Sequence, residues 1–191
     1  MTSSLSVISE IKKKICDGPY VYQAETRLYN HEFGNDERFR LIYLSADVYP
    51  DCLNKGKSSS YEACQYARTN GVAGDSVGQI IGRQLGGIKD PSNVFPWNKK
   101  VDISAWKADE KEVYNHVKNG KNAHAHLMYG IQYNEDEEAE PRRLSEIHYC
   151  FQLFENSNTL VRTIEGHFKN TSPRVTNENF YYKGSPFVRC D

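Results

Sequence analysis

The sequence lacks a long apolar run, and its charges almost cancel. No stretch is long enough to span a membrane, and residues 1–14 lack the apolar core of a secretory signal. We expect no membrane partner, and either a cytoplasmic protein or one that is delivered or secreted with its leader absent. The formal net charge of −1 supplies no overall basic field for nucleic acid. A local basic groove is still compatible with this balance.

Cysteine motifs for metal or redox chemistry are also missing. The five cysteines are Cys16, Cys52, Cys64, Cys150 and Cys190, and none of them forms a Cys-x-x-Cys pair. This spacing argues against a zinc ribbon or a thioredoxin-type site. In an oxidising compartment Cys52 and Cys64 would be able to close a loop, but the odd number leaves one thiol outside any intramolecular pair. The cysteines therefore do not identify the compartment.

Alternating apolar and polar residues are abundant, and 13 tyrosines accompany them. This pattern is typical of strands, which we predict over residues 20–29, 39–48, 123–133, 147–153 and 160–168. Asn35-Asp36 favours a hairpin turn between the first two. Helical spacing from Leu5 to Ile15 predicts a short amphipathic helix. The length of 191 residues fits a single domain, 1–191.

A second helix is predicted over residues 104–119, with Ser104 as its cap and Gly120 at its end. Glu110 falls within the apolar stripe of this helix. A carboxylate among apolar neighbours is costly unless it is paired or linked to a metal. The alternative is a glutamate at the edge of the stripe that reaches solvent.

Three histidines, His124, His126 and His148, are expected on one face of the predicted sheet. They would form either a second metal site or a displaced catalytic base. The plainer interpretation, histidines on a wet face, is favoured because no carboxylate or cysteine accompanies them at a ligand spacing.

The stretch 75–110 carries the most unusual combination of residues. Gly82, Gly86 and Gly87 permit close backbone approach, and they precede Asn93 and Asp102, whose oxygens are of the kind that magnesium accepts. The pattern predicts a short strand, a glycine-rich turn, a polar loop and the start of a helix. Composition alone favours a plain connecting loop, because turns use the same residues.

The order of residues is more specific. The run from Gly78 to Gly87, followed by Asn93-Val94-Phe95-Pro96, resembles the core of the DNA/RNA non-specific endonucleases, which have a ββα-metal active site. The resemblance covers residues 75–133. It implies an α+β fold in which an antiparallel sheet carries a ββα-metal motif and a few flanking helices.

The resemblance also implies a site. Asp102 stands where the family usually has its metal-binding asparagine, while Asn93 and Glu110 match family residues. The implied metal ligands are Asp102 and Asn93, and the implied cofactor is a divalent cation such as magnesium. Arg83 and Glu110 would hold the site together.

The chain departs from the family at Gln79, because the family has its general-base histidine at this position. A glutamine amide can orient water but cannot take its proton. Losing a positioned base costs about 10²- to 10⁴-fold in rate. Asp75, or a histidine from elsewhere in the chain, remains an alternative base.

Three functions follow from these residues. The first is a metal-dependent, sequence-non-specific DNA/RNA endonuclease with impaired or altered activity, which uses Arg83, Arg142 and Arg143 for phosphate contacts. The second is an inactive nuclease-like scaffold that binds nucleic acid or a partner protein. The third is a delivered nuclease toxin or effector, in which polar segments would meet a protein partner or inhibitor.

Overall fold

A computed structural model describes residues 2–15, 28–134 and 142–171 of the protein. Five strands form an antiparallel sheet in the order β1-β2-β5-β6-β7, and β3 and β4 form a separate two-stranded ribbon. The strands are β1 Tyr29–Asn35, β2 Leu41–Val48, β3 Asp75–Gln79, β4 Val94–Asn98, β5 His124–Tyr133, β6 Leu144–Glu155 and β7 Thr159–Lys169. The helices are α1 Ser4–Lys12, α2 Tyr61–Asn70 and α3 Ser104–Asn119. The α+β class and the antiparallel sheet are as predicted.

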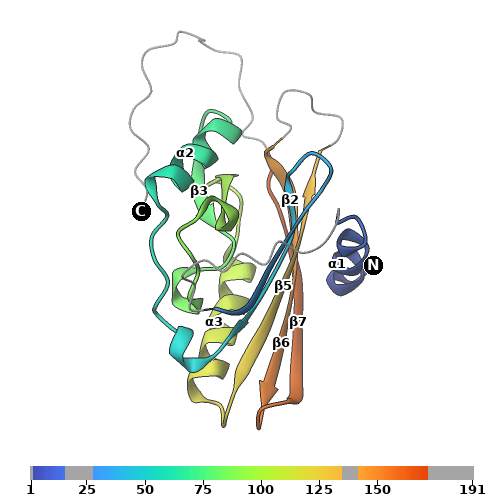
Figure 1. The fold of residues 1–191 in the computed structure, drawn as a ribbon, viewed down its shortest axis with the longest axis vertical. Coiled ribbons are helices and arrows are strands. Elements are labelled where there is room, and N and C mark those ends of the chain that lie inside the picture. The colour runs from blue at the N-terminus through green and yellow to red at the C-terminus, as the bar shows by residue number, and fades with distance from the viewer. Residues whose placement is uncertain (1, 16–27, 135–141, 172–191) are drawn as a thin grey trace.

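The large sheet is covered on both faces (Figure 1). Helix α1 lies on one face, where Ile8 packs with Tyr43 and Cys150. Helix α3 and the β3–β4 ribbon lie on the other face, over the main core. The alternation predicted for residues 123–133 is confirmed, because Leu127 and Tyr129 point into this core and are fully buried.

The first hairpin is shifted along the chain relative to the prediction. The predicted strand 20–29 lies mostly outside the described residues, and β1 occupies most of the segment expected to turn. The turn follows at Asp36, whose Oδ1 accepts hydrogen bonds from the backbone N–H groups of Arg38 and Arg40, both at 2.9 Å. The reversal is therefore stabilised by the Asp36 side chain.

Helix α2 and strand β4 were not predicted. The buried face of α2 consists of Ala63, Cys64 and Ala67, which are too small to give a strong periodic signal. Strand β4 contains Pro96, which normally argues against a strand. The residue is tolerated because β4 belongs to a ribbon of only two strands.

The pairing of Cys52 with Cys64 is wrong. Cys64 is in a disulfide in which Cys52 takes no part. Cys52 is a buried thiol whose Sγ accepts a hydrogen bond from the Tyr49 backbone N–H at 3.3 Å. Among the described residues, no helix is both long and apolar enough to cross a membrane.

A buried arginine joins the ribbon to the sheet, which corrects the prediction of Arg143 as an exposed phosphate contact. Only 4% of Arg143 is exposed, and its Nε and Nη2 donate to the two carboxylate oxygens of Asp75 in β3, at 2.7 and 3.0 Å. Its Nη1 donates to the Asn170 carbonyl beyond β7 at 2.9 Å. This bidentate pair also engages Asp75, the alternative base considered above.

We predict that Arg143→Ala lowers the free energy of unfolding by about 3–5 kcal/mol, since it leaves the buried Asp75 carboxylate without its cation. Arg162→Ala is the matched control, because the Arg162–Glu112 pair is largely exposed and should contribute at most about 1 kcal/mol. Urea unfolding of both variants measures the difference. Equal losses in the two variants would contradict the structural role of Arg143.

Candidate functional site

The loop between β3 and β4 is shaped by one amide. Asn93 is completely buried, and its Oδ1 accepts a hydrogen bond from the Ile81 N–H at 2.8 Å. Its Nδ2 donates to the carbonyls of Ile81 and Ile88, both at 3.0 Å. The side chain thus replaces missing backbone pairing inside the loop. This position leaves Asn93 no exposed oxygen with which to approach a cation.

The loop is compact because a second segment lies against it. Backbone N–H groups of Asn54, Lys57 and Ser60 donate to carbonyls of the loop at 2.9–3.1 Å. At Gly87 a Cβ atom would come within 1.9 Å of the Ile81 carbonyl oxygen, so only glycine fits there. The polar segment before α2 therefore supports the loop from behind its backbone carbonyls.

Gln79 ends β3 and points toward this polar segment. Its Nε2 donates to the Lys57 carbonyl at 3.0 Å and, at the longer distance of 3.5 Å, to the Ile88 carbonyl. Both amide hydrogens are directed at the backbone, so the orientation of the side chain is well defined. Its remaining polar atom is the acceptor Oε1, which can orient a water molecule.

A cleft of about 590 Å³ lies between the loop and α3. Its lining residues are Gly82, Arg83, Gln84, Leu85, Lys107, Glu110, Lys111, Tyr114 and Asn115. Three of them carry positive charge, and Arg83 is positioned by a hydrogen bond of 2.9 Å from its Nη1 to Ser58. Gln79, Asn93 and Asp102 are not part of this lining. The cleft brings Arg83 and Glu110 together, with a lysine on either side of Glu110 in the chain.

Glu110 is the buried acid of the cleft, with 8% of its surface exposed. Its Oε1 accepts a hydrogen bond from the Gly82 N–H at 3.3 Å, and its Oε2 lies 2.6 Å from the Lys107 ammonium. Burial raises the pKa of Glu110, while Lys107 and the Gly82 N–H act in the opposite direction. The carboxylate is thus paired, as its place in the apolar stripe required.

Asp102 lies at the start of α3 and is exposed. Its Oδ1 accepts a hydrogen bond from the Ser104 N–H at 2.8 Å. The backbone and side-chain hydrogen bonds from Ser104 lower the pKa of Asp102. The N-cap residue is Ile103 rather than the predicted Ser104, and Asp102, one residue before it, accepts from the first N–H group of the helix.

The residues offer a partial set of metal ligands. In the part of the chain that the structure describes, no group of three or more His, Cys, Asp or Glu side chains is arranged to hold a metal ion. Magnesium, however, is commonly held by one or two carboxylates together with waters and substrate phosphates. Asp102 provides an ionised carboxylate of this kind, and Glu110 would have to exchange its lysine. The donors fit an ion shared with a substrate better than one enclosed by protein.

The three histidines share a sheet face but do not form one site. Their partners are separate: the Asp47 carboxylate for His126, the rings of Tyr49 and Phe154 for His124, and the Glu146 carboxylate for His148. Across the β5–β6 pair, His126 is opposite Gln152, whereas His148 is opposite Gly130. None of the three lines the cleft beside Glu110.

Strands β3 and β4 followed by α3 form a ββα unit with a cationic cleft and a buried acid, which is the layout of a nuclease domain. A family model described as DNA/RNA non-specific endonuclease matches residues 20–148. The protein therefore belongs to the DNA/RNA non-specific endonuclease family.

Two solved structures are similar to this chain, and the first of them has the same overall fold. An "extracellular endonuclease" superposes with a TM-score of 0.55 at 11% identity, covering 93% of this chain and 90% of that chain. An "extracellular nuclease" gives a TM-score of 0.48 at 11% identity, with coverage of 83% and 92%. A comparison with curated proteins finds no match.

Sequence reasoning missed Lys107 and Lys111. A usable signal was present, because Lys107 precedes Glu110 by three residues and this spacing brings two side chains together on a helix. The contribution of residues 54–60 had no such signal, since it depends on backbone contacts between distant segments.

We predict that Glu110 lowers the free energy of unfolding at higher pH. Because its pKa is raised in the folded state, the folded protein binds the proton more tightly than the unfolded chain, whose ordinary value is 4.5. The stabilisation is complete below that value and is lost as pH rises through the folded pKa. Relative to Glu110→Gln, the native protein should therefore lose stability upward from about pH 4.5 in urea unfolding. If the free energy of unfolding changes with pH in the same way in both proteins, Glu110 does not cause this loss of stability.

Proposed function

We propose that the protein is a sequence-non-specific DNA/RNA endonuclease with impaired hydrolysis, which binds the phosphodiester backbone in the cleft beside Glu110. The observation that supports this most directly is the set of cations around that acid, Arg83, Lys107 and Lys111. Guanidinium and ammonium groups neutralise phosphate oxygens without reading sequence. Membership of the endonuclease family makes a nucleic acid the natural substrate.

In this proposal Arg83 contacts the phosphate and Glu110 keeps Lys107 and the Gly82 N–H in place around it. Asp102 is the direct ligand of a divalent cation, with magnesium as the expected ion. When bound, such an ion would neutralise the phosphate and stabilise the leaving oxygen. Asn93 contributes indirectly, by fixing the loop that carries Gly82.

Hydrolysis is expected to be slow because Gln79 supplies no proton acceptor. Its Oε1 can orient the attacking water, but the proton must leave to solvent. A histidine at this position would titrate near neutral pH and would act as a general base.

The inactive scaffold is the second candidate. Two observations favour it: both amide hydrogens of Gln79 are directed at backbone carbonyls, and Lys107 already neutralises Glu110. A scaffold of this kind would still bind nucleic acid through the cationic cleft. The two candidates therefore differ in cleavage rather than in binding.

The decisive experiment compares native protein with Gln79→His and Gln79→Ala on plasmid and RNA, with magnesium or manganese and then with a chelator. For the impaired endonuclease we expect slow, metal-dependent cleavage that rises by about 10²- to 10⁴-fold in Gln79→His. Cleavage that appears only in Gln79→His supports the scaffold. No cleavage in any form, with no binding of nucleic acid, would exclude both.

Asp102 is tested by three substitutions. Asp102→Ala should abolish metal-dependent cleavage, whereas Asp102→Asn should retain it, since an amide oxygen also binds magnesium. Asp102→Ser keeps a capping oxygen for Ser104 but provides no carboxylate, so it separates loss of the metal ligand from loss of the helix cap. Full cleavage by the alanine and serine variants would show that the metal lies elsewhere.

A further inference from the structure

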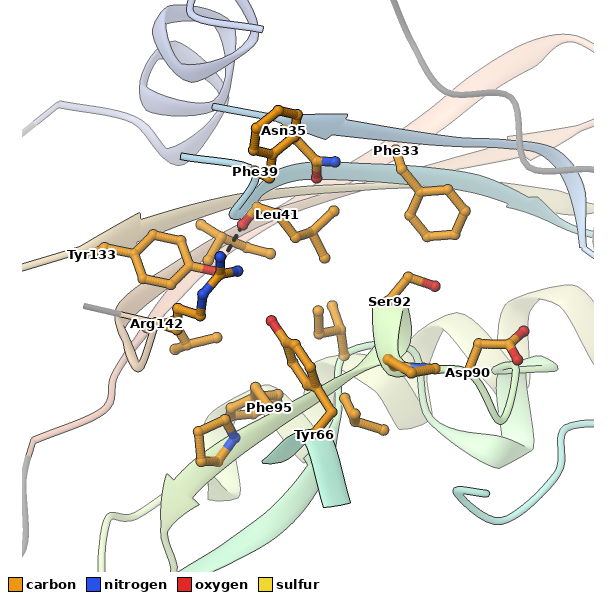
Figure 2. Close-up of a pocket in the computed structure, with 16 residues that line it drawn as sticks. Phe33, Asn35, Phe39, Leu41, Tyr66, Asp90, Ser92, Phe95, Tyr133 and Arg142 are labelled. Atoms are coloured by element: carbon orange, nitrogen blue, oxygen red, sulfur yellow. Dashed lines mark hydrogen bonds between the residues drawn. The ribbon is translucent and has the colours of Figure 1, made fainter. Parts of the chain in front are cut away.

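A second cavity, with a volume of about 440 Å³, lies between the large sheet and the segment formed by α2 and β4 (Figure 2). Its volume is typical of ligand pockets. Aromatic rings come from several elements: Phe33 in β1, Phe39 before β2, Tyr66 in α2, Phe95 in β4 and Tyr133 in β5. No residue of the cleft beside Glu110 lines it.

Phe39 is the most unusual residue of this cavity. Its side chain is large and apolar, yet 80% of its surface is exposed. Its backbone is in the left-handed region, with φ of 57°, where a bulky residue is strained. Its N–H donates to the Asp36 carbonyl at 2.9 Å, so the turn holds the ring at the cavity. Packing in the described chain does not account for a phenylalanine at this position.

Tyr133 forms a rigid wall. Its hydroxyl donates to the Leu41 carbonyl at 3.0 Å, and the Arg40 guanidinium lies 4.5 Å from the centre of its ring. Arg40 is in turn held by Asp36, with 2.7 Å between Nε and Oδ2. Asp36 therefore orients both Phe39 and Arg40, the residue that packs against the Tyr133 ring. Two aromatic surfaces are set in place before any ligand arrives.

One end of the cavity is polar and positively charged. Figure 2 shows the Tyr66 hydroxyl directed into the cavity, with the Arg142 side chain on the same side. Burial raises the pKa of Tyr66, and Arg142 acts in the opposite direction, so this group stays a neutral hydrogen-bond donor beside a cation. An anionic group is the complement of this end.

We propose that this cavity binds an unpaired nucleobase of a single-stranded nucleic acid, with the adjoining phosphate at Arg142. The inference rests on the proposed function and names single strands as its preferred substrate. Flat aromatic walls stack on any base, and a cation beside them takes the phosphate. A base inside a duplex has both faces covered and cannot enter. Ile80 lines this cavity and Gly82 lines the cleft, so one loop adjoins both.

The ring of Phe39 is tested by Phe39→Asn, because asparagine adopts the left-handed conformation readily and the variant should fold at least as well. Affinity for a labelled oligothymidylate is measured by fluorescence anisotropy in EDTA, which stops cleavage. We expect a loss of about 5- to 150-fold, the equivalent of one lost stacking contact. Tyr61→Asn is the control, since Tyr61 is 70% exposed but does not line the cavity.

Arg142→Gln should weaken binding and lower the salt dependence of affinity by about one phosphate contact. Arg162→Gln removes another exposed charge, outside the cavity, and should change neither quantity. Photocrosslinking with 5-iodouracil in the oligonucleotide, followed by peptide mass spectrometry, should label Phe39, Tyr66 or Tyr133.

The inference is overturned if Phe39→Asn binds single strands as well as native protein does, or if crosslinks map only to other residues. Equal affinity for single strands and for duplex of the same length would also overturn it. Failure of the proposed function would give a different result. Plasmid and RNA would stay uncleaved in the presence of metal, but the protein would still bind single strands selectively in EDTA. If the native protein cleaves nucleic acid and Phe39→Asn binds single strands as tightly as the native protein does, the proposed function stands and this inference is wrong.

Discussion

The buried pair between Arg143 and Asp75 is the contact on which the arrangement of the site depends. Among the described strands, the β3–β4 ribbon pairs with none of the large sheet, so side-chain contacts must position it. Arg143 immediately precedes β6, and its guanidinium donates to both carboxylate oxygens of Asp75, the first residue of β3. With that end anchored, Asn93 organises the loop at the other end of the ribbon. The cleft beside α3 follows from these two constraints.

The cleft is lined by cations on both sides, while the side chain that our proposal assigns to proton transfer lies outside it. Positive charge from both the loop and α3 surrounds it, and its acid is buried and paired. Gln79, which our proposal places at the position of the proton acceptor, carries an amide whose Nε2 donates to the Lys57 carbonyl. Charge neutralisation and proton transfer are separate contributions to phosphodiester cleavage, and in this molecule the residues for the first are the better represented.

Elements with strong periodicity were predictable. Helix α3 has the predicted bounds, and β7 is close to them, because large apolar residues mark their buried faces at regular spacing. Helix α2 was missed because its buried side chains are small, and β4 because proline normally ends a strand. Within the site, the resemblance implied a ββα motif although residue pattern alone missed β4, and the need for a partner at Glu110 followed from its place in the apolar stripe. The burial of Arg143 and of Asn93 was not predictable. In a sequence, a buried arginine or asparagine cannot be told from an exposed one until its partners in the fold are known.

The sequence by itself determined the family of the protein, the α+β class and the chemistry available at Gln79, since these depend on residue identity and order. Only the tertiary structure decided which charged groups are accessible. Arg142 and Arg143 are adjacent in the chain, yet one lines an open cavity and the other is buried against Asp75. The physical reason is that a charge is buried only where folding brings a partner of opposite charge to it, and that partner lies 68 residues away in the chain.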